Sequence, residues 1–265
     1  MDADELRQRI AAFPRWAYRF EFDGGVSTPV GERSRINRQR QRHAYFFSRL
    51  LALSGGTLRG LRVLDLGCNA GFWALGAIEA GAEFVAGIDF KQEYIDQAQL
   101  VFEANAIAPE RYRFERRDIF SGALPRDFDV VLCLGVLGHT DRPVELFELI
   151  AATGVRLVVI DTNTSRARLS LFELSRQYGT SDLVGDGLVL VPSRQAVVDL
   201  ADRHGFATVA LAPNWTDLDG IGDYRRERRR AFICARGYEL GVLPAERRAP
   251  LIPWWIRDPR ALLSV

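Results

Sequence analysis

Short apolar runs alternate with longer stretches of mixed polarity through the middle of the chain. Runs such as residues 63–66 and 128–135 are too short for a helix and almost continuously apolar, as are central strands of a parallel sheet covered on both faces. The stretches between them carry apolar residues at helical spacing. The pattern therefore predicts an α/β fold, a Rossmann-like, seven-stranded, mostly parallel sheet with helices on both faces. The predicted strands are residues 63–66, 84–88, 113–117, 128–135, 154–161, 208–211 and 231–235.

A glycine-rich turn follows the first of these strands, and an acid, Asp89, ends the second. A dinucleotide-binding turn needs further glycines so that the backbone can approach a pyrophosphate and the helix can pack closely. Asn69 and Phe72 occupy those places, whereas Gly67 and Gly71 still allow a sharp turn. The turn therefore favours a nucleoside without a pyrophosphate, and S-adenosylmethionine is such a ligand. An ordinary strand-turn-helix corner is the alternative.

Acids near the predicted strand ends suggest how the nucleoside is held. Asp89 is placed to accept hydrogen bonds from two ribose hydroxyls, and Asp65 lies near the cationic amino-acid end of the ligand. Asp118 and Ile119 follow the third strand, where they could hold the adenine amino group and ring face. The predicted donor-binding residues are Asp65, Gly67, Cys68, Asn69, Gly71, Asp89, Phe90, Asp118, Ile119, Leu134 and Gly135.

Composition narrows the functional classes. With 265 residues, 48% of them hydrophobic, the chain can bury a full core, and a formal charge of +1 gives no overall attraction to nucleic acid or membrane. The three cysteines are not at metal-ligand or disulfide-like spacings, so we expect reduced core thiols and no metal. No apolar run approaches the ~18 residues of a membrane span, so we expect no membrane association and a cytoplasmic location.

Two arginine clusters stand out from the neutral background. Residues 33–42 contain five arginines in a predicted helix, and residues 225–230 contain five more in a predicted loop. Such clusters usually form a solvated face. The alternative is that they bind an anionic substrate or an RNA backbone.

Residues 61–237 resemble a class I S-adenosylmethionine-dependent methyltransferase, on the motif VLDLGCNAGFWAL. LGVLGH after the fourth strand, LVPS before a later helix and residues 16–29 resemble the branch that includes tRNA wobble-uridine carboxymethyl-transferring enzymes. In those enzymes a tyrosine precedes the histidine of LGVLGH and helps to hold a carboxylated donor, but here it is Gly138. Their upstream lysine has no counterpart, and Arg230 matches their late arginine only in an uncertain register. The resemblance therefore implies methyl transfer from ordinary S-adenosylmethionine.

His139 is the candidate catalytic base, with Asp141 as a carboxylate that could orient it. An alcohol or phenol acceptor must lose a proton, and His139 follows the central strand at the crevice where open parallel sheets bind ligands. A histidine that only forms the wall of the site is the alternative. His204 is predicted at a helix C-terminus, and His43 lies in the basic helix with no partner implied.

These observations leave three functional classes. The first is a methyltransferase acting on an oxygen or nitrogen of a small molecule, such as a sugar or secondary metabolite. The second is a tRNA wobble-uridine-modifying methyl or carboxymethyl transferase that uses the arginine clusters as a phosphate track. The third is a catalytically silent binding protein on the same fold. The neutral charge favours the first.

The flanking segments complete the predicted organisation. Residues 1–60 form an N-terminal helical and aromatic segment that covers the acceptor site of the methyltransferase domain, residues 61–237. Residues 162–192 form an insertion near the acceptor site, with a helical pattern at residues 168–178. In the C-terminal tail, residues 238–265, Trp254 and Trp255 could dock on their own domain or on a second subunit, which would make a homodimer.

Overall fold

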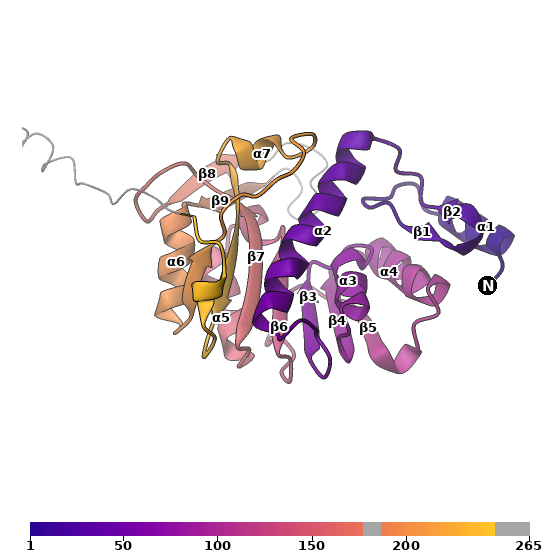
Figure 1. Cartoon of the computed structure of the whole chain (residues 1–265), viewed down its shortest axis with the longest axis horizontal. Coiled ribbons are helices and arrows are strands. Elements are labelled where there is room, and N and C mark those ends of the chain that lie inside the picture. The colour runs from indigo at the N-terminus through magenta and orange to yellow at the C-terminus, as the bar shows by residue number, and fades with distance from the viewer. Residues whose placement is uncertain (177–186, 247–265) are drawn as a thin grey trace, which may run out of the picture.

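The structure is a computed structural model that describes residues 1–176 and 187–246 (Figure 1). A seven-stranded sheet forms its centre, with the strand order β10-β11-β7-β6-β3-β4-β5. The strands from β7 to β5 in this order are parallel, and β11 pairs antiparallel with both β7 and β10. This confirms the predicted fold class. The strands are β3 Arg62–Leu66, β4 Phe84–Asp89, β5 Tyr112–Arg116, β6 Val130–Leu134, β7 Leu157–Asn163, β10 Ala207–Ala210 and β11 Arg229–Ala235.

Helices cover both faces of this sheet. Val63 points into a core shared with α2, α3 and α4, whereas its neighbour Leu64 points into a second core shared with α5 and α6. Alternate residues of a strand face opposite sides, so strands buried on both faces must be apolar throughout. The helices are α1 Ala3–Ala11, α2 Arg33–Leu53, α3 Phe72–Glu79, α4 Gln92–Ala104, α5 Pro143–Ala152, α6 Arg194–Arg203 and α7 Gly222–Arg225.

The N-terminal segment lies beside the half of the sheet that β4 and β5 occupy. It contains α1 and a short hairpin of β1 (Glu21–Phe22) and β2 (Val26–Ser27), which Figure 1 shows next to α4. The exposed Arg9 of α1 pairs with Glu103 of α4 at 2.9 Å. Helix α2 then crosses the sheet towards β7. Single 3₁₀ turns lie at Asp23–Gly25, Pro109–Arg111, Leu137–His139 and Leu240–Val242.

The insertion differs from its sequence prediction. The helical pattern at residues 168–178 was wrong, because Phe172–Arg176 forms strand β8 and pairs antiparallel with β9, Leu188–Pro192. Apolar residues at helical spacing do not make a helix when a neighbouring apolar strand offers a complete ladder of hydrogen bonds. Residues 177 and 178 lie outside the described part of the chain.

Strand β11 also begins earlier than its apolar run. It starts at Arg229, so Arg229 and Arg230 belong to the sheet and not to the loop before it. The three cysteines are free and buried, as predicted. Trp254 and Trp255, the predicted docking residues of the tail, lie outside the described residues.

Candidate active site

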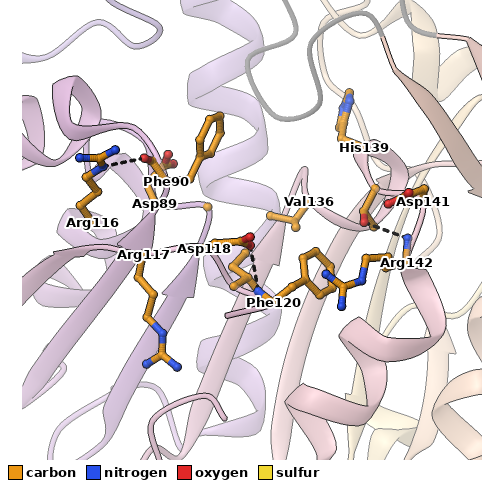
Figure 2. A pocket seen from close by; sticks show the side chains of 13 residues that line it. Asp89, Phe90, Arg116, Arg117, Asp118, Phe120, Val136, His139, Asp141 and Arg142 are labelled. Atoms are coloured by element: carbon orange, nitrogen blue, oxygen red, sulfur yellow. Dashed lines mark hydrogen bonds between the residues drawn. The ribbon is translucent and has the colours of Figure 1, made fainter. Parts of the chain in front are cut away.

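A cavity of about 520 Å³ opens where β3, β4, β5 and β6 end (Figure 2). Seven of the predicted site residues line it, and the carboxyl edge of a parallel sheet is where such folds bind ligands. The cavity is lined by Gly67, Asp89, Phe90, Arg116, Arg117, Asp118, Ile119, Phe120, Val136, His139, Thr140, Asp141 and Arg142.

Asp89, at the end of β4, is held in one orientation by backbone donors. Its carboxylate accepts hydrogen bonds from the N–H of Asn69 at 3.0 Å and of Lys91 at 3.1 Å. Burial raises the pKa of Asp89, and these N–H groups work against that shift. Asn69 does not line the cavity, so its visible role is to orient Asp89.

The glycine turn is fixed to β4 by its own N–H groups. The N–H groups of Gly67 and Cys68 both donate to the carbonyl of Ile88, at 2.8 and 3.0 Å. Gly67 has a φ of +66°, and a Cβ there would lie 2.7 Å from Val136 Cγ2, so a side chain is excluded. N–H groups bound in this way cannot cradle a pyrophosphate, which agrees with the nucleoside prediction.

Two predicted ligand residues of the turn are structural. Cys68 is fully buried, its thiol would lie 2.8 Å from a Cβ at Gly87, and burial raises the pKa of that thiol. Gly71 is the N-cap residue of α3.

Asp65, on β3, is a buried carboxylate whose one nearby donor in the described part of the chain, the N–H of Ala74, lowers its pKa without meeting hydrogen-bond geometry. It is 1% exposed, and neither carboxylate oxygen has a partner among the described residues. Burial, followed by the charge of Asp89, holds the pKa of Asp65 well above its usual range. A buried acid of this kind is stabilised by a cationic partner, and an ammonium group of a ligand is such a partner.

The far wall of the cavity comes from the segment after β5. Asp118 accepts a hydrogen bond from the N–H of Phe120 at 2.9 Å, and Ile119 is 8% exposed. Phe90, 38% exposed, also lines the cavity. These side chains offer an acid and apolar surface together, which suits an adenine ring, and this assignment stays a prediction.

His139 and Asp141 both line the cavity, on and after the 3₁₀ turn Leu137–His139. Their side chains point in different directions, and no hydrogen bond joins them (Figure 2). Asp141 therefore does not orient His139 in this arrangement. The other histidines are remote from the described cavity lining: His204 caps the C-terminus of α6, and His43 packs on Phe47 at 4.5 Å.

Leu134 and Gly135, at the end of β6, do not line the cavity. Leu134 pairs with Asp161 of β7, and the N–H of Gly135 donates to the carbonyl of Asp161 at 2.8 Å.

Gly138 leaves no room for the tyrosine of the carboxymethyl-transferring enzymes, because a Cβ there would lie 2.7 Å from Thr162 Oγ1.

A buried ionic cluster beside Gly135 was missed by the sequence analysis. Asp161, fully buried in β7, accepts hydrogen bonds from Arg42 of α2 at 2.6 Å, from Arg229 of β11 at 2.7 Å and from the hydroxyl of Tyr224 at 2.7 Å. Burial alone would raise the pKa of Asp161, but the charges of Arg229 and Arg42 outweigh it and lower that pKa. The only sequence signal was an acid at the end of an apolar strand.

This cluster corrects the solvated-face prediction for three of the ten arginines, whereas Arg33, Arg40, Arg225, Arg226 and Arg228 are exposed, as that prediction has them. Arg42 and Arg229 are 7% exposed and Arg230 is 3% exposed, so none lies on a solvated face or a phosphate track. Arg38 makes two hydrogen bonds of 2.7 Å to Asp223. Arg38 and Arg42 therefore join α2 to Asp223 and Tyr224 of α7.

Tyr18 closes the N-terminal segment over this region. Its ring stacks on Phe72 of α3, with centroids 4.8 Å apart and planes inclined by 6°. Burial raises the pKa of Tyr18, the charge of Arg42 lowers it and that of Asp65 raises it, so its hydroxyl lies near both groups.

These features fit S-adenosylmethionine. The cavity offers Asp89 for ribose hydroxyls. Asp65 does not line the cavity but lies two residues before Gly67, which does, and it is a buried acid that a cationic group would stabilise. Gly67 allows close approach of a ligand at the turn between them.

Comparisons with known proteins agree with a site for S-adenosylmethionine. The family described as "Methyltransferase domain" matches residues 64–155. A ubiquinone biosynthesis O-methyltransferase of Neisseria meningitidis is 35% identical over 179 residues, which cover 61% of this chain and 74% of that protein. A tRNA U34 carboxymethyltransferase of Idiomarina loihiensis is 27% identical over 167 residues, or 61% of this chain and 50% of that protein.

A solved structure has the same fold. The N-terminal domain of EvdMO1, crystallised in the presence of SAH and D-fucose, has a TM-score of 0.68 and 20% sequence identity, covering 89% of this chain and 98% of that one. The chain therefore belongs to the class I S-adenosylmethionine-dependent methyltransferases. It is an enzyme, and S-adenosylmethionine is its cofactor. In the described part of the chain, no helix is long and apolar enough to cross a membrane.

Proposed function

We propose that this enzyme transfers a methyl group to an oxygen or nitrogen of a small molecule, a sugar or secondary metabolite, and that a hydroxyl oxygen is the favoured acceptor. The observation that carries the proposal is the position of His139 on the wall of the cavity that also contains Asp89. A base at that wall is useful for a hydroxyl, which must lose a proton, and less useful for a neutral amine. A similar protein named an O-methyltransferase supports the same choice.

The chemical step requires little of the protein beyond alignment and proton removal. Bound S-adenosylmethionine supplies a methyl group already activated by its sulfonium. Asp89 and Asp65 would hold its ribose and amino-acid ends, and such alignment supplies up to ~7–11 kcal/mol of the barrier. His139 would accept the acceptor proton, a contribution of ~10²- to 10⁴-fold.

A tRNA acceptor is the second candidate, because a tRNA-modifying protein is among the similar sequences. Four of the ten arginines in the two clusters, Arg38, Arg42, Arg229 and Arg230, have partners within the described residues. Five others are exposed: Arg33, Arg40, Arg225, Arg226 and Arg228. The buried arginines are not accessible to phosphates, whereas the five exposed ones are, so the arginine clusters do not decide between the two candidates.

A gene-deletion strain tests the choice between the two. Mass spectrometry of its metabolites and of its tRNA nucleosides should show an unmethylated small molecule and unchanged tRNA. Loss of a modified wobble uridine with an unchanged metabolite pool would contradict the proposal.

A further inference from the structure

The hairpin of β8 and β9 has an apolar face that the described part of the chain leaves largely exposed. Residues paired across two antiparallel strands share a face, and alternate residues of each strand return to it. By the register of this pair, Phe172, Leu174, Leu188 and Leu190 lie on one face, which we call the hairpin face. Leu174 is 63% exposed and Leu188 is 46% exposed.

The hairpin face points away from the body of the protein. On the opposite face, Val189 is fully buried, and Glu173 and Ser175 line a hollow against the loop before β11. An antiparallel sheet that packs on one face normally presents polar side chains on the other. A hairpin of two strands is only marginally stable by itself, and a contiguous exposed apolar patch marks an interaction surface. The hairpin face therefore lacks a covering segment among the described residues.

The C-terminal end of the described chain lies at the base of this hairpin. The N–H of Glu246 donates to the carbonyl of Ala210 at 2.9 Å, and the carbonyl of Glu246 accepts a hydrogen bond from Arg194 Nη2 at 3.0 Å. Arg194 begins α6, directly after the residue that follows β9. Leu188, at the other end of β9, is about 13 Å from the base of the strand. Glu246 is therefore held close to the hairpin face.

The segment after Glu246 has the composition and the length to cover this face. Residues 251–256 are all apolar and include Trp254 and Trp255, and each tryptophan can bury about 150–250 Å². Five residues of extended chain span at most about 18 Å, so this apolar run begins within reach of Leu188. Six extended residues then cover about 20 Å, which matches the length of about 17 Å of a five-residue strand such as β8 or β9.

We infer that residues 251–256 pack on the hairpin face of their own chain, with the indole rings of Trp254 and Trp255 over Leu174 and Leu188. A second copy of the chain would offer the same face. A tether of a few residues gives an effective concentration of about a millimolar, which exceeds that of a second copy in a micromolar solution. The contact within one chain is therefore favoured. It does not depend on which acceptor the enzyme methylates.

Fluorine NMR of the full chain labelled with 5-fluorotryptophan tests this contact. The variants Trp254→Phe and Trp255→Phe assign the two resonances of the segment. The resonance of Trp73, which is 1% exposed, reports whether the core is folded.

Two variants disturb the hairpin face, and a third is their control. Leu174→Glu and Leu188→Glu each place on this face a carboxylate that the indole rings would have to bury without a partner, which is unfavourable. Leu218→Glu is the matched control, because Leu218 is 55% exposed but lies in the loop between β10 and α7.

The inference predicts that the resonances of Trp254 and Trp255 in the parent lie away from that of free 5-fluorotryptophan. Each hairpin variant should move both resonances to the free position and leave that of Trp73 in place. The control variant and an about tenfold dilution of the parent should move neither, because a contact within one chain is independent of concentration.

Three results would overturn the inference. The first is that the resonances of Trp254 and Trp255 already lie at the free position in the parent. The second is that neither hairpin variant moves them, or that Leu218→Glu moves them equally. The third is that dilution moves them, which would assign the hairpin face to a second copy of the chain.

Discussion

Replacing Asp161 by asparagine tests how much the buried ionic cluster that joins α2, β7 and β11 stabilises the fold. The substitution keeps the shape of the side chain but leaves Arg42 and Arg229 facing each other without a negative charge between them. Asp161 is fully buried and both arginine side chains are 9% exposed, so solvent cannot replace the missing charge.

The expected loss is large. Removing one partner of a buried ion pair lowers the free energy of unfolding by ~3–5 kcal/mol. In a protein of this size each kcal/mol shifts Tm by roughly 2–4 °C, so Asp161→Asn should lower Tm by about 6–20 °C. Asp4→Asn is the matched control, since Asp4 pairs with Arg7 at 2.6 Å but its side chain is 87% exposed. Exposed pairs of this kind contribute little, so its Tm should not change measurably.

The pH dependence of the effect follows from the sign of the shift. The pKa of Asp161 is lowered in the folded protein, so its stabilisation is present above the ordinary carboxyl pKa and is lost as the pH falls through the folded value. The difference in Tm between parent and Asp161→Asn should therefore persist from pH 7 down to about 4 and shrink below that. Thermal unfolding followed by circular dichroism measures it. A difference no larger than that of the Asp4→Asn control would refute the stabilising role of the cluster.

The remaining predictions concern the donor and the acceptor proton. Asp89→Ala should weaken S-adenosylhomocysteine binding by ~1.5–3 kcal/mol, the range for hydrogen bonds to a charged group, and unchanged affinity in calorimetry would contradict the ribose assignment. Because burial raises the pKa of Asp65, donor binding should release a proton and tighten as the pH rises through that pKa. In calorimetry with two buffers, Asp65→Asn should show neither the proton release nor the tighter binding at higher pH. Proton release equal to that of the parent would mean that Asp65 is not the group that loses the proton. His139→Ala should lower turnover by ~10²- to 10⁴-fold at unchanged donor affinity, and steady-state kinetics with normal turnover but weaker donor binding would make His139 only a wall of the site.

Periodicity was sufficient for the central sheet but not for the insertion. Continuous apolar runs bounded by turn residues predicted the strands on which both faces are buried. The helix prediction failed at Phe172–Arg176 because this segment pairs with another strand, β9, and the periodicity of a single segment contains no information about such pairing.

The candidate site likewise contains residues that the sequence could place and residues that it could not. Asp89, Asp118 and His139 follow strands whose carboxyl ends meet at one edge of the sheet, so topology alone brings them to one cavity. Arg42 and Asp161 are 119 positions apart, and their hydrogen bond depends on where α2 crosses the sheet. Local sequence describes Arg42 as one more arginine of a basic helix, so its buried role could be recognised only in three dimensions.

Transfer of a labelled methyl group by the purified enzyme tests the central claim most directly. The enzyme and its His139→Ala variant would be incubated with methyl-labelled S-adenosylmethionine and a cell extract that is then separated into small molecules, tRNA and protein. The structure and the proposed function predict label in a small molecule with the parent enzyme and strongly reduced label with the variant. Label confined to tRNA or protein, or the absence of label in every fraction despite donor binding, would contradict the claim.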